Sequence, residues 1–513
     1  MPPVSKAHTG VTGPIWTKTA SMPERPKLSQ DTTADVCIVG AGIAGLSTAY
    51  LLVQAGKSVV VVESGNLAGG ETARTTAHLS FALDDQYQHL EGLHGEKGAR
   101  LAAESHQAAV ARIEYICRQE KIDCHFARLD GYLFCPPGES TDVLKHEREA
   151  AHRAGIVDAE LVDRAPIPNF DTGTALKFPR QGQFHPLRYL AALVTAIERD
   201  GGRVYAKTHA VDFAGGTDAH IKTKDGHTVR ASALVMATNT PVNDRVTMHT
   251  KQAAYRTYAI GLKVKRGSVP LALYWDTLDP YHYVRIESVG GEQSKHDVLI
   301  VGGEDHKTGQ EDDYPERFTR LEAWAREHFP VEGVEYQWSG QVLEPVDGLA
   351  FIGRNPGDED NVYIATGDSG HGMTHGTIAG ILISDLILGR ENPWATIYDP
   401  SRISLRAATE FVKENVNVAL EYGKWITPGE LSSVDEIEPG QGAILRRGAT
   451  KIAAYRDTSG KVLELSAVCP HLGCIVAWNE VEKSWDCPCH GSRFAKDGKV
   501  INGPAIGGLA KVE

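Results

Sequence analysis

The stretch Asp35-Val-Cys-Ile-Val-Gly40-Ala-Gly42-Ile-Ala-Gly45 decides the fold of the larger part of this 513-residue chain. A short apolar run enters a turn with glycines at the spacing GxGxxG, and a predicted helix over residues 46–54 follows. A second apolar run, residues 58–62, ends at Glu63. GxGxxG alone is a weak signal, but strand, glycine turn, helix, strand and terminal acid in this order form the dinucleotide-binding fingerprint. The sequence therefore predicts an α/β sheet that binds a dinucleotide.

The glycine turn would let the backbone approach a pyrophosphate at the N-terminus of the helix. Unpaired N–H groups and the helix dipole favour an anion there. The acid that ends the second run would accept hydrogen bonds from ribose hydroxyls. A turn with only a structural role is the less favoured alternative. The predicted nucleotide-binding residues of this region are Gly40, Gly42, Ile43, Ala44, Gly45, Glu63 and Ser64.

The C-terminal region carries two Cys/His pairs. Cys469-Pro-His471 is followed, after fifteen intervening residues, by Cys487-Pro-Cys-His490. Two cysteines and two histidines can hold zinc. They also suit a Rieske [2Fe-2S] cluster, in which two histidines replace two thiolates on one iron and raise the reduction potential. We predict the cluster, with Cys469 and Cys487 on one iron and His471 and His490 on the other, and electron transfer as part of the function.

Each cluster loop also holds a spare cysteine, Cys474 or Cys489, which a zinc site does not need. The loops CPHLGC and CPCHGS resemble those of Rieske proteins of the respiratory type, in which the spare cysteines form a disulfide. The resemblance therefore implies a Cys474–Cys489 disulfide. It also implies a hydrogen bond from Ser492 to cluster sulfur, whereas the tyrosine that gives a second one is replaced by Phe494. Because such donors stabilise the more negative reduced cluster, we expect a lower potential than in the respiratory proteins.

Several further segments resemble flavin-binding parts of the D-amino-acid oxidase family, in the family's order. They are residues 70–76, 184–187, 233–238, 347–353 and 362–376. The resemblance implies that the dinucleotide is FAD and that a helix beginning near Met373 points its N-terminal dipole at the flavin. Val211, placed by spacing alone at the adenine, would equally suit a surface strand. The residues that the resemblance implies for FAD are Thr72, Arg74, Thr75, Thr76, Val211, Ala237, Thr238, Gly367, Gly370, Gly372, Met373 and Thr374.

The substrate side is expected between the flavin-binding segments. Tyr281, Tyr283 and Arg285 alternate along a predicted strand and would share one face. Two aromatic rings and a cation would suit an anionic substrate, and members of the family often hold a substrate carboxylate with an arginine. We predict Tyr283, Arg285 and His371 as catalytic residues. The alternative for the strand is an exposed face of aromatic and arginine side chains.

These features predict an α/β FAD-binding domain, Rossmann-like and of the glutathione-reductase and D-amino-acid oxidase type, with an inserted α+β substrate domain. A C-terminal all-β Rieske domain follows. The predicted boundaries are 1–30 for an N-terminal arm, 31–81, 180–245 and 336–425 for the FAD-binding domain, 82–179 and 246–335 for the substrate domain, and 426–513 for the Rieske domain.

From residue 31 onward the order of parts resembles bacterial FAD-dependent oxidoreductases of the D-amino-acid oxidase type with a fused Rieske domain. The resemblance implies a dehydrogenase in which an amine or amino acid passes a hydride to FAD. The cluster then passes electrons singly to an acceptor such as a ferredoxin, a cytochrome or a quinone. No second nucleotide fingerprint for a nicotinamide is present. Two alternatives stay open: a flavin monooxygenase supplied with electrons through the cluster, and a non-enzymatic redox sensor or carrier.

Composition restricts the partners and the location. The formal net charge of -13 argues against a nucleic-acid partner, for which a basic face is expected. No apolar run approaches the roughly 20 residues of a membrane helix, and no signal peptide is apparent. We therefore expect no membrane span and a cytoplasmic protein. The remaining cysteines show no shared metal spacing and are expected to be reduced; they are Cys37, Cys117, Cys124 and Cys135.

Overall fold

The computed structural model describes residues 12–243, 246–291 and 293–512. The first eleven residues of the predicted arm therefore lie outside the described residues. The rest of the arm forms α1 (Trp16–Thr19) and is packed into the molecule. Trp16 is completely buried, and its Nε1 donates a hydrogen bond to the Thr75 carbonyl at 2.6 Å. This part of the arm thus contacts the predicted phosphate loop.

The first sheet contains the strands of the predicted dinucleotide-binding fingerprint. β1 (Thr32–Val39) is parallel to both of its neighbours, and its second half is buried. The valines of the neighbouring β2 (Val59–Val62) are all buried, as is typical of a parallel strand covered on both faces. The strand order is β16 (Phe351–Arg354), β17 (Val362–Thr366), β10 (Thr228–Met236), β1, β2 and β7 (Arg203–Tyr205), while β8 (Ala210–Ala214) and β9 (His220–Thr223) pair beside β10.

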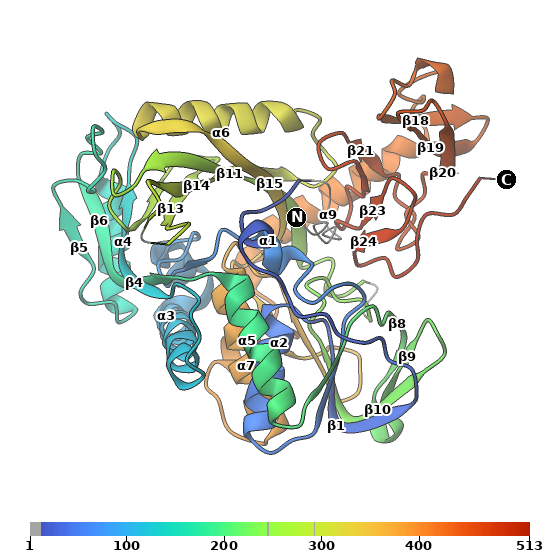
Figure 1. Cartoon of the computed structure of the whole chain (residues 1–513), viewed down its shortest axis with the longest axis horizontal. Helices are drawn as coiled ribbons and strands as arrows, with labels where there is room; N and C mark the ends of the chain where they lie inside the picture. Colours follow the sequence, from blue (N-terminus) through green and yellow to red (C-terminus); the bar gives the residue numbers. More distant parts are fainter. Residues whose placement is uncertain (1–11, 244–245, 292, 513) are drawn as a thin grey trace.

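Three helices cover one side of this sheet: α2 (Ile43–Gln54), α5 (Pro186–Arg199) and α7 (Gly372–Ile387) (Figure 1). Glycines let α7 lie tightly on α2, because a Cβ at Gly376 would come within 2.6 Å of the Ile43 side chain and one at Gly380 within 2.7 Å of Ser47. Both helices begin just after a strand of the parallel sheet. Their N-termini therefore lie together at one edge of the sheet.

The second sheet carries the predicted substrate side. Its strand order is β15 (Val331–Pro345), β11 (Gln252–Lys265), β14 (His296–Lys307), β13 (His282–Glu287), β12 (Leu273–Asp276), β4 (Ala127–Phe134), β6 (Ala175–Gln183) and β3 (His78–Leu79), with β5 (Glu160–Val162) on β6. The flanking helices are α3 (Tyr87–Gln119), α4 (Asp142–Arg153) and α6 (Tyr314–His328). β15 and β6 each continue across a predicted domain boundary, at 335/336 and 179/180, so these two strands of the second sheet run into segments predicted for the FAD-binding domain.

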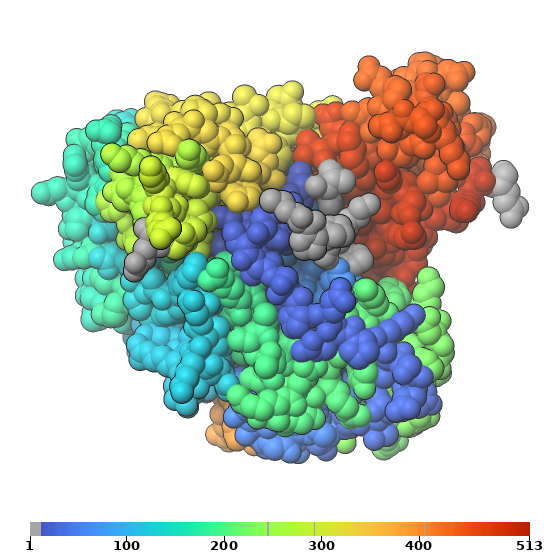
Figure 2. Space-filling model, viewed as in Figure 1, coloured from blue at the N-terminus to red at the C-terminus, as the bar shows by residue number. Residues whose placement is uncertain are grey.

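The chain then passes through α8 (Ala395–Tyr398) and α9 (Ala408–Glu421) into small antiparallel sheets. One sheet has three strands, β18 (Gly442–Arg447), β19 (Thr450–Arg456) and β20 (Val462–Ser466). The other has four, β21 (Ala477–Asn479), β22 (Ser484–Asp486), β23 (Arg493–Ala495) and β24 (Val500–Asn502). This region, orange to red, packs against the yellow part of the second sheet (Figure 2). The predicted fold class, an α/β domain with an inserted α+β part and an all-β module, is confirmed.

Across the described parts of the chain, every helix is either too short or too polar to cross a bilayer.

Candidate active site

A cavity of about 1150 Å³ lies where the two sheets and the C-terminal module meet. Its walls include the glycine turn, the loop that leads into α7, strand β15 and residues 482–506 of the C-terminal module. Most of the predicted FAD-binding residues line it: Gly40, Gly42, Ile43, Ala44, Glu63, Ser64, Thr72, Arg74, Thr75, Thr76, Ala237, Thr238, Gly370, Gly372 and Met373.

The glycine turn is held by backbone contacts that exclude larger residues. Gly40 has φ +106°, and a Cβ there would lie 2.3 Å from the Ala237 carbonyl. A Cβ at Gly45 would lie 1.9 Å from the Gly40 carbonyl. Glu63 is fixed beside the turn, because its carboxylate accepts hydrogen bonds from the backbone N–H groups of Ala41 and Gly65, both at 2.9 Å. The turn therefore offers open backbone next to an oriented acid.

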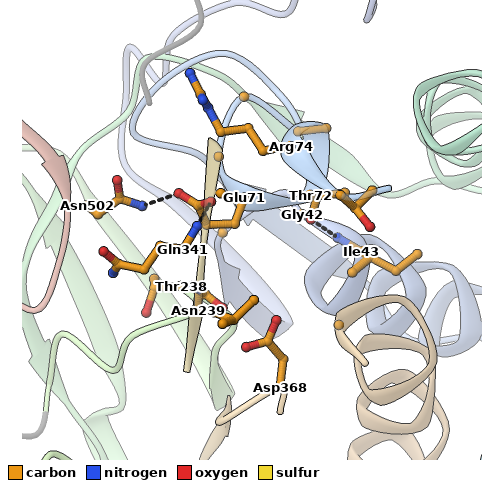
Figure 3. Close-up of a pocket in the computed structure, with 18 of the residues that line it drawn as sticks. Gly42, Ile43, Glu71, Thr72, Arg74, Thr238, Asn239, Gln341, Asp368 and Asn502 are labelled. Carbon is orange, nitrogen blue, oxygen red and sulfur yellow. Dashed lines mark hydrogen bonds between the residues drawn. The ribbon is translucent and has the colours of Figure 1, made fainter. Parts of the chain in front are cut away.

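The predicted second phosphate loop touches this turn (Figure 3). Thr72 lies in the 3-10 helix Glu71–Arg74, and its Oγ1 accepts a hydrogen bond from the Ile43 N–H at 3.2 Å. Neither α2 nor α7 has a side-chain cap at its N-terminus. Two helix N-termini whose N-cap residues give no side-chain cap meet at one cavity, and they favour a ligand with negative charge along its length. The residues present thus fit the pyrophosphate and the flavin of FAD.

The other predicted FAD residues lie just behind the wall. Gly45 packs on the turn itself, and Gly367 has φ +74° and packs against Pro345. The hydroxyl of Thr374 contacts His106 Nδ1 at 2.9 Å, so it points toward α3. In the segment predicted to meet adenine, residues 208–210 line the cavity and Val211 does not.

Arg285 does not occupy the place predicted for it. Its side chain is fully buried and paired with Glu287, and it does not line the cavity. The guanidinium also donates to the carbonyls of Ala77 and Phe184, both at 3.0 Å, and lies 5.2 Å from the Trp16 ring. These partners hold the arginine inside the protein, so the expectation that it binds a substrate carboxylate is not met by this geometry.

The two tyrosines and His371 do line the cavity. The Tyr283 hydroxyl lies 2.8 Å from Thr257 Oγ1, and its ring lies over Gly302, where a Cβ would come within 2.3 Å. Tyr281 donates to Asp84 Oδ2 at 2.9 Å. Tyr281 and Tyr283 therefore form part of the substrate-side wall, as the alternating pattern predicts.

Carboxylates on the cavity wall are the main feature that sequence reasoning missed; they are Asp84, Asp305 and Asp368. Asp84 Oδ1 lies 3.4 Å from His371 Nε2. Burial opposes the charged ring, but Asp84 raises the pKa of His371 above its ordinary value. Burial raises the pKa of Asp305 to about 7 and that of Asp368 to about 6. These acids come from segments far apart in the sequence, Asp305 from strand β14 and the other two from loops, and no local spacing marks them.

The predicted cluster ligands converge in the C-terminal module. Cys469 and Cys487 are within hydrogen-bond reach of each other, and the rings of His471 and His490 are 5.1 Å apart. The spare cysteines, Cys474 and Cys489, are joined in a disulfide. With that pair bonded, two thiol and two imidazole groups remain as donors. This donor set fits a Rieske cluster.

The neighbours of the cluster loops also follow the predicted pattern. The Ser492 side chain hydrogen-bonds Cys469, and Phe494 is fully buried in the same apolar core as the cluster cysteines. His249, outside the module, is buried, and its ring lies 4.8 Å from His471 and 5.9 Å from His490. The histidine side of the cluster site therefore faces the oxidoreductase part of the chain, at the segment that leads into β11.

Arg74, predicted to bind FAD, also holds the C-terminal module. Its Nη1 lies 3.1 Å from Glu482 Oε1 and donates to the Thr12 hydroxyl at 3.0 Å. In the same loop, Glu71 accepts a hydrogen bond from Asn502 Nδ2 at 2.9 Å (Figure 3). The C-terminal module thus contacts the phosphate loop at two residues, Arg74 and Glu71. Spacing along the sequence does not predict these contacts.

Comparison with known proteins agrees with this geometry. Residues 35–386 match the DAO family of FAD dependent oxidoreductases, and residues 427–513 match the Rieske [2Fe-2S] domain. YhfW of Bacillus subtilis (strain 168), described as a Rieske 2Fe-2S iron-sulfur protein, is 34% identical over 504 residues, covering 97% of both chains.

Two further relatives resemble only the oxidoreductase part. Gamma-glutamylputrescine oxidoreductase of Escherichia coli (strain K12) is 28% identical over 378 residues, or 71% of this chain and 85% of the relative. Glycine oxidase from Geobacillus kaustophilus superposes with a TM-score of 0.61 at 18% identity, covering 72% of this chain and 99% of the other. The second likeness shows a shared fold.

The family matches confirm both predicted cofactors. The first domain binds FAD, and the second binds a [2Fe-2S] cluster. The Rieske match also decides against the zinc alternative. The chain is an enzyme that belongs to the DAO family of FAD-dependent oxidoreductases and carries a Rieske [2Fe-2S] domain after the oxidoreductase domain.

Proposed function

We propose that this oxidoreductase is a dehydrogenase for an amine or an amino acid whose electrons leave singly, through the Rieske cluster, to an external acceptor. Bound FAD supplies a group that accepts a hydride, and the cluster supplies one-electron exchange. The acceptor, such as a ferredoxin, a cytochrome or a quinone, is part of the proposal. So is the cytoplasmic location.

The names of two similar proteins support the substrate class. One is an oxidoreductase of gamma-glutamylputrescine, an amine, and the other is an oxidase of glycine, an amino acid. In this chain, the same cavity continues past the FAD-binding residues to Trp275, Tyr281 and Tyr283. A small organic substrate would meet these aromatic side chains on the second sheet.

Gln341 carries the proposal for the electron route. It is buried, lines the FAD cavity, and its Nε2 donates to the carbonyl of Gly491 at 3.0 Å. Gly491 directly follows the predicted cluster ligand His490. The backbone N–H of Gln341 donates to Glu71 Oε2 at 2.6 Å, so the contact is braced from the phosphate loop. One side chain therefore connects the two cofactor sites by covalent and hydrogen bonds.

Removal of one cluster ligand tests the route. In Cys487→Ser, anaerobic mixing with a substrate should still bleach the flavin, whereas turnover with a one-electron acceptor should be lost. Cys135→Ser, which changes a buried free thiol outside the Rieske domain, is the matched control. Acceptor-linked turnover that survives in Cys487→Ser would show that the electrons bypass the cluster. If none of the amines or amino acids tested bleaches the flavin, the dehydrogenase proposal itself fails.

A further inference from the structure

We propose that the substrate is an amine without a carboxylate on its reacting carbon, bound as a cation by Asp305 and Asp84 among the rings of Trp275, Tyr281 and Tyr283. This inference rests on the proposed function and names the substrate class of the same site. It replaces the anionic substrate that the sequence pattern suggested.

The charge of the substrate-side wall supports a cationic substrate; the lysines that line the cavity belong to the N-terminal arm and the C-terminal module. Residues 82–179 and 246–335, the predicted substrate domain, contribute two carboxylates and three large aromatic rings to the wall, and no lysine or arginine among the described residues. A substrate carboxylate would meet like charges there, which disfavours binding. A substrate cation would be attracted by the carboxylates and by the faces of the rings.

The arginines nearest in sequence or position to this wall are paired with other groups. Arg285 is buried against Glu287 outside the cavity. Arg74 lines the cavity, but its guanidinium is paired with Glu482 and donates to Thr12. Each is held by a buried carboxylate, so moving it to a substrate carboxylate would leave that acid without its cation, at high cost.

Asp84 fixes one end of the cation site. Its Oδ2 accepts the Tyr281 hydrogen bond at 2.9 Å, and a Cβ at Gly370 would come within 2.6 Å of the same oxygen. The carboxylate therefore lies directly on the turn that precedes α7. The Asp84 backbone N–H donates to His371 Nε2 at 3.0 Å, and the same ring nitrogen lies 3.4 Å from Asp84 Oδ1.

Asp305 is the acid whose charge is least balanced. Its Oδ1 is buried and accepts no hydrogen bond within the described structure. Arg317 attracts its charge, but the Nε of this arginine pairs with Asp313 at 2.7 Å and its Nη1 donates to the Glu304 carbonyl at 2.8 Å. A buried carboxylate oxygen without a partner is costly unless a ligand supplies one. An ammonium group is the ligand that would supply both the charge and the donors.

Matched pairs of compounds test the class on the FAD- and cluster-loaded full chain. Butylamine and norvaline differ only by the carboxylate on the reacting carbon, as do putrescine and ornithine. We expect the amine of each pair to bleach the flavin anaerobically at least tenfold faster than its amino acid at equal low concentration. A faster reaction of the amino acids would overturn the inference.

Binding without oxidation gives a second, independent measurement. Tetramethylammonium cannot be oxidised by hydride transfer, because its quaternary nitrogen has no lone pair. Its binding is measured by the change in flavin absorption and by the quenching of tryptophan fluorescence. We expect Asp305→Asn to weaken this binding at least tenfold, Asp305→Glu to restore part of it, and Asp312→Asn, which changes an exposed acid that does not line the cavity, to leave it unchanged.

The two proposals can fail separately. If no compound of either pair bleaches the flavin, the dehydrogenase proposal fails, while the tetramethylammonium titration still decides the charge of the site. If the wild-type protein does not bind tetramethylammonium, or if Asp305→Asn binds it equally well, the cation site is refuted. Far-UV circular dichroism and FAD content check that each variant is folded, and Asp84→Asn offers a second variant if Asp305→Asn does not fold.

Discussion

Glu482 and Arg74 form an ion pair of 3.1 Å in which both side chains are completely buried. The glutamate belongs to the Rieske domain and the arginine to the second phosphate loop. Arg256, from the substrate-side sheet, lies 3.6 Å from the same glutamate oxygen. Burial opposes ionisation, but these arginines and Arg493 lower the pKa of Glu482 to about 2. One buried charge thus connects the Rieske domain with the second phosphate loop and with the second sheet.

Loss of this charge should loosen the assembly. Glu482→Gln leaves buried arginines without their anion, which costs about 3 to 5 kcal/mol of the free energy of unfolding. Because the pKa of Glu482 is lowered on folding, its contribution is present above the ordinary value of 4.5 and is lost as the pH falls toward 2. Urea unfolding at neutral pH measures the effect.

The control is Glu464→Gln, which breaks an exposed pair with Arg447 in the same domain and should cost about 1 kcal/mol or less. Equal losses for the two variants would contradict the role of the buried charge.

The glycine turn should tolerate no side chain at Gly45. In Gly45→Ala the new Cβ would lie 1.9 Å from the Gly40 carbonyl, so the turn must move away from the pyrophosphate position. We expect purified Gly45→Ala to lose most of its FAD while it keeps the absorption of the cluster. Gly70→Ala, at an open position in the second phosphate loop, should keep both. A full flavin content in Gly45→Ala would show that the turn does not hold the cofactor.

Two glycines of the cluster loops give a matched test of docking. Gly491 and Gly473 have φ values of +74° and +82°, so alanine strains the backbone at both. Only at Gly491 does a Cβ meet a neighbour, 2.4 Å from the Ala254 side chain in the second sheet. Gly491→Ala should therefore displace the cluster loop at a cost of about 1 to 3 kcal/mol.

In rapid-mixing experiments, reduction of the cluster after flavin bleaching should slow in Gly491→Ala, whereas Gly473→Ala should resemble the parent protein. An equal effect in both variants would assign the change to backbone strain instead of docking.

The reduction potential of the cluster should respond to a hydroxyl at position 494. Ser492 already hydrogen-bonds Cys469, and Phe494 lies in the core beside the cluster cysteines. A donor that stabilises the reduced state in Phe494→Tyr should raise the midpoint potential by on the order of 50 mV. Potentiometry followed by electron paramagnetic resonance measures this, with Phe494→Leu as the control for altered packing. An unchanged midpoint in Phe494→Tyr would refute the prediction.

The parts of the site that could be predicted are local in the sequence. Residues 32–62 contain β1, the glycine turn, α2 and β2 in succession, and this order is enough to predict how they pack. The cluster ligands likewise lie in two short loops. Alternation also placed Tyr281 and Tyr283 correctly on one face, because a strand has a period of two.

The parts that could not be predicted depend on contacts between distant segments. The same alternation does not predict which groups pack against that face. Arg285 is bound by Glu287 and by backbone carbonyl groups, and not by a substrate. Arg74 and Glu482 are 408 residues apart. Asp84 follows β3 and Asp305 lies in β14, and only the pairing of these distant strands in one sheet brings both acids to the cavity.

Binding of a cation should strengthen as the pH rises through about 7. Burial raises the pKa of Asp305 to about 7; Asp84 and Glu304 add to this rise, whereas Thr257 and Arg317 oppose it. The neighbouring Tyr281 and Tyr283 stay neutral because their pKa values lie above 10. Protonation below this pH removes the charge that attracts the ligand. Tetramethylammonium does not titrate, so its dissociation constant should fall as the pH rises from 6 to 8, by up to about tenfold per unit below the pKa. Asp305→Asn should remove this dependence, whereas Asp312→Asn should keep it. The same pH profile in Asp305→Asn would assign the titration to His371 or to another group.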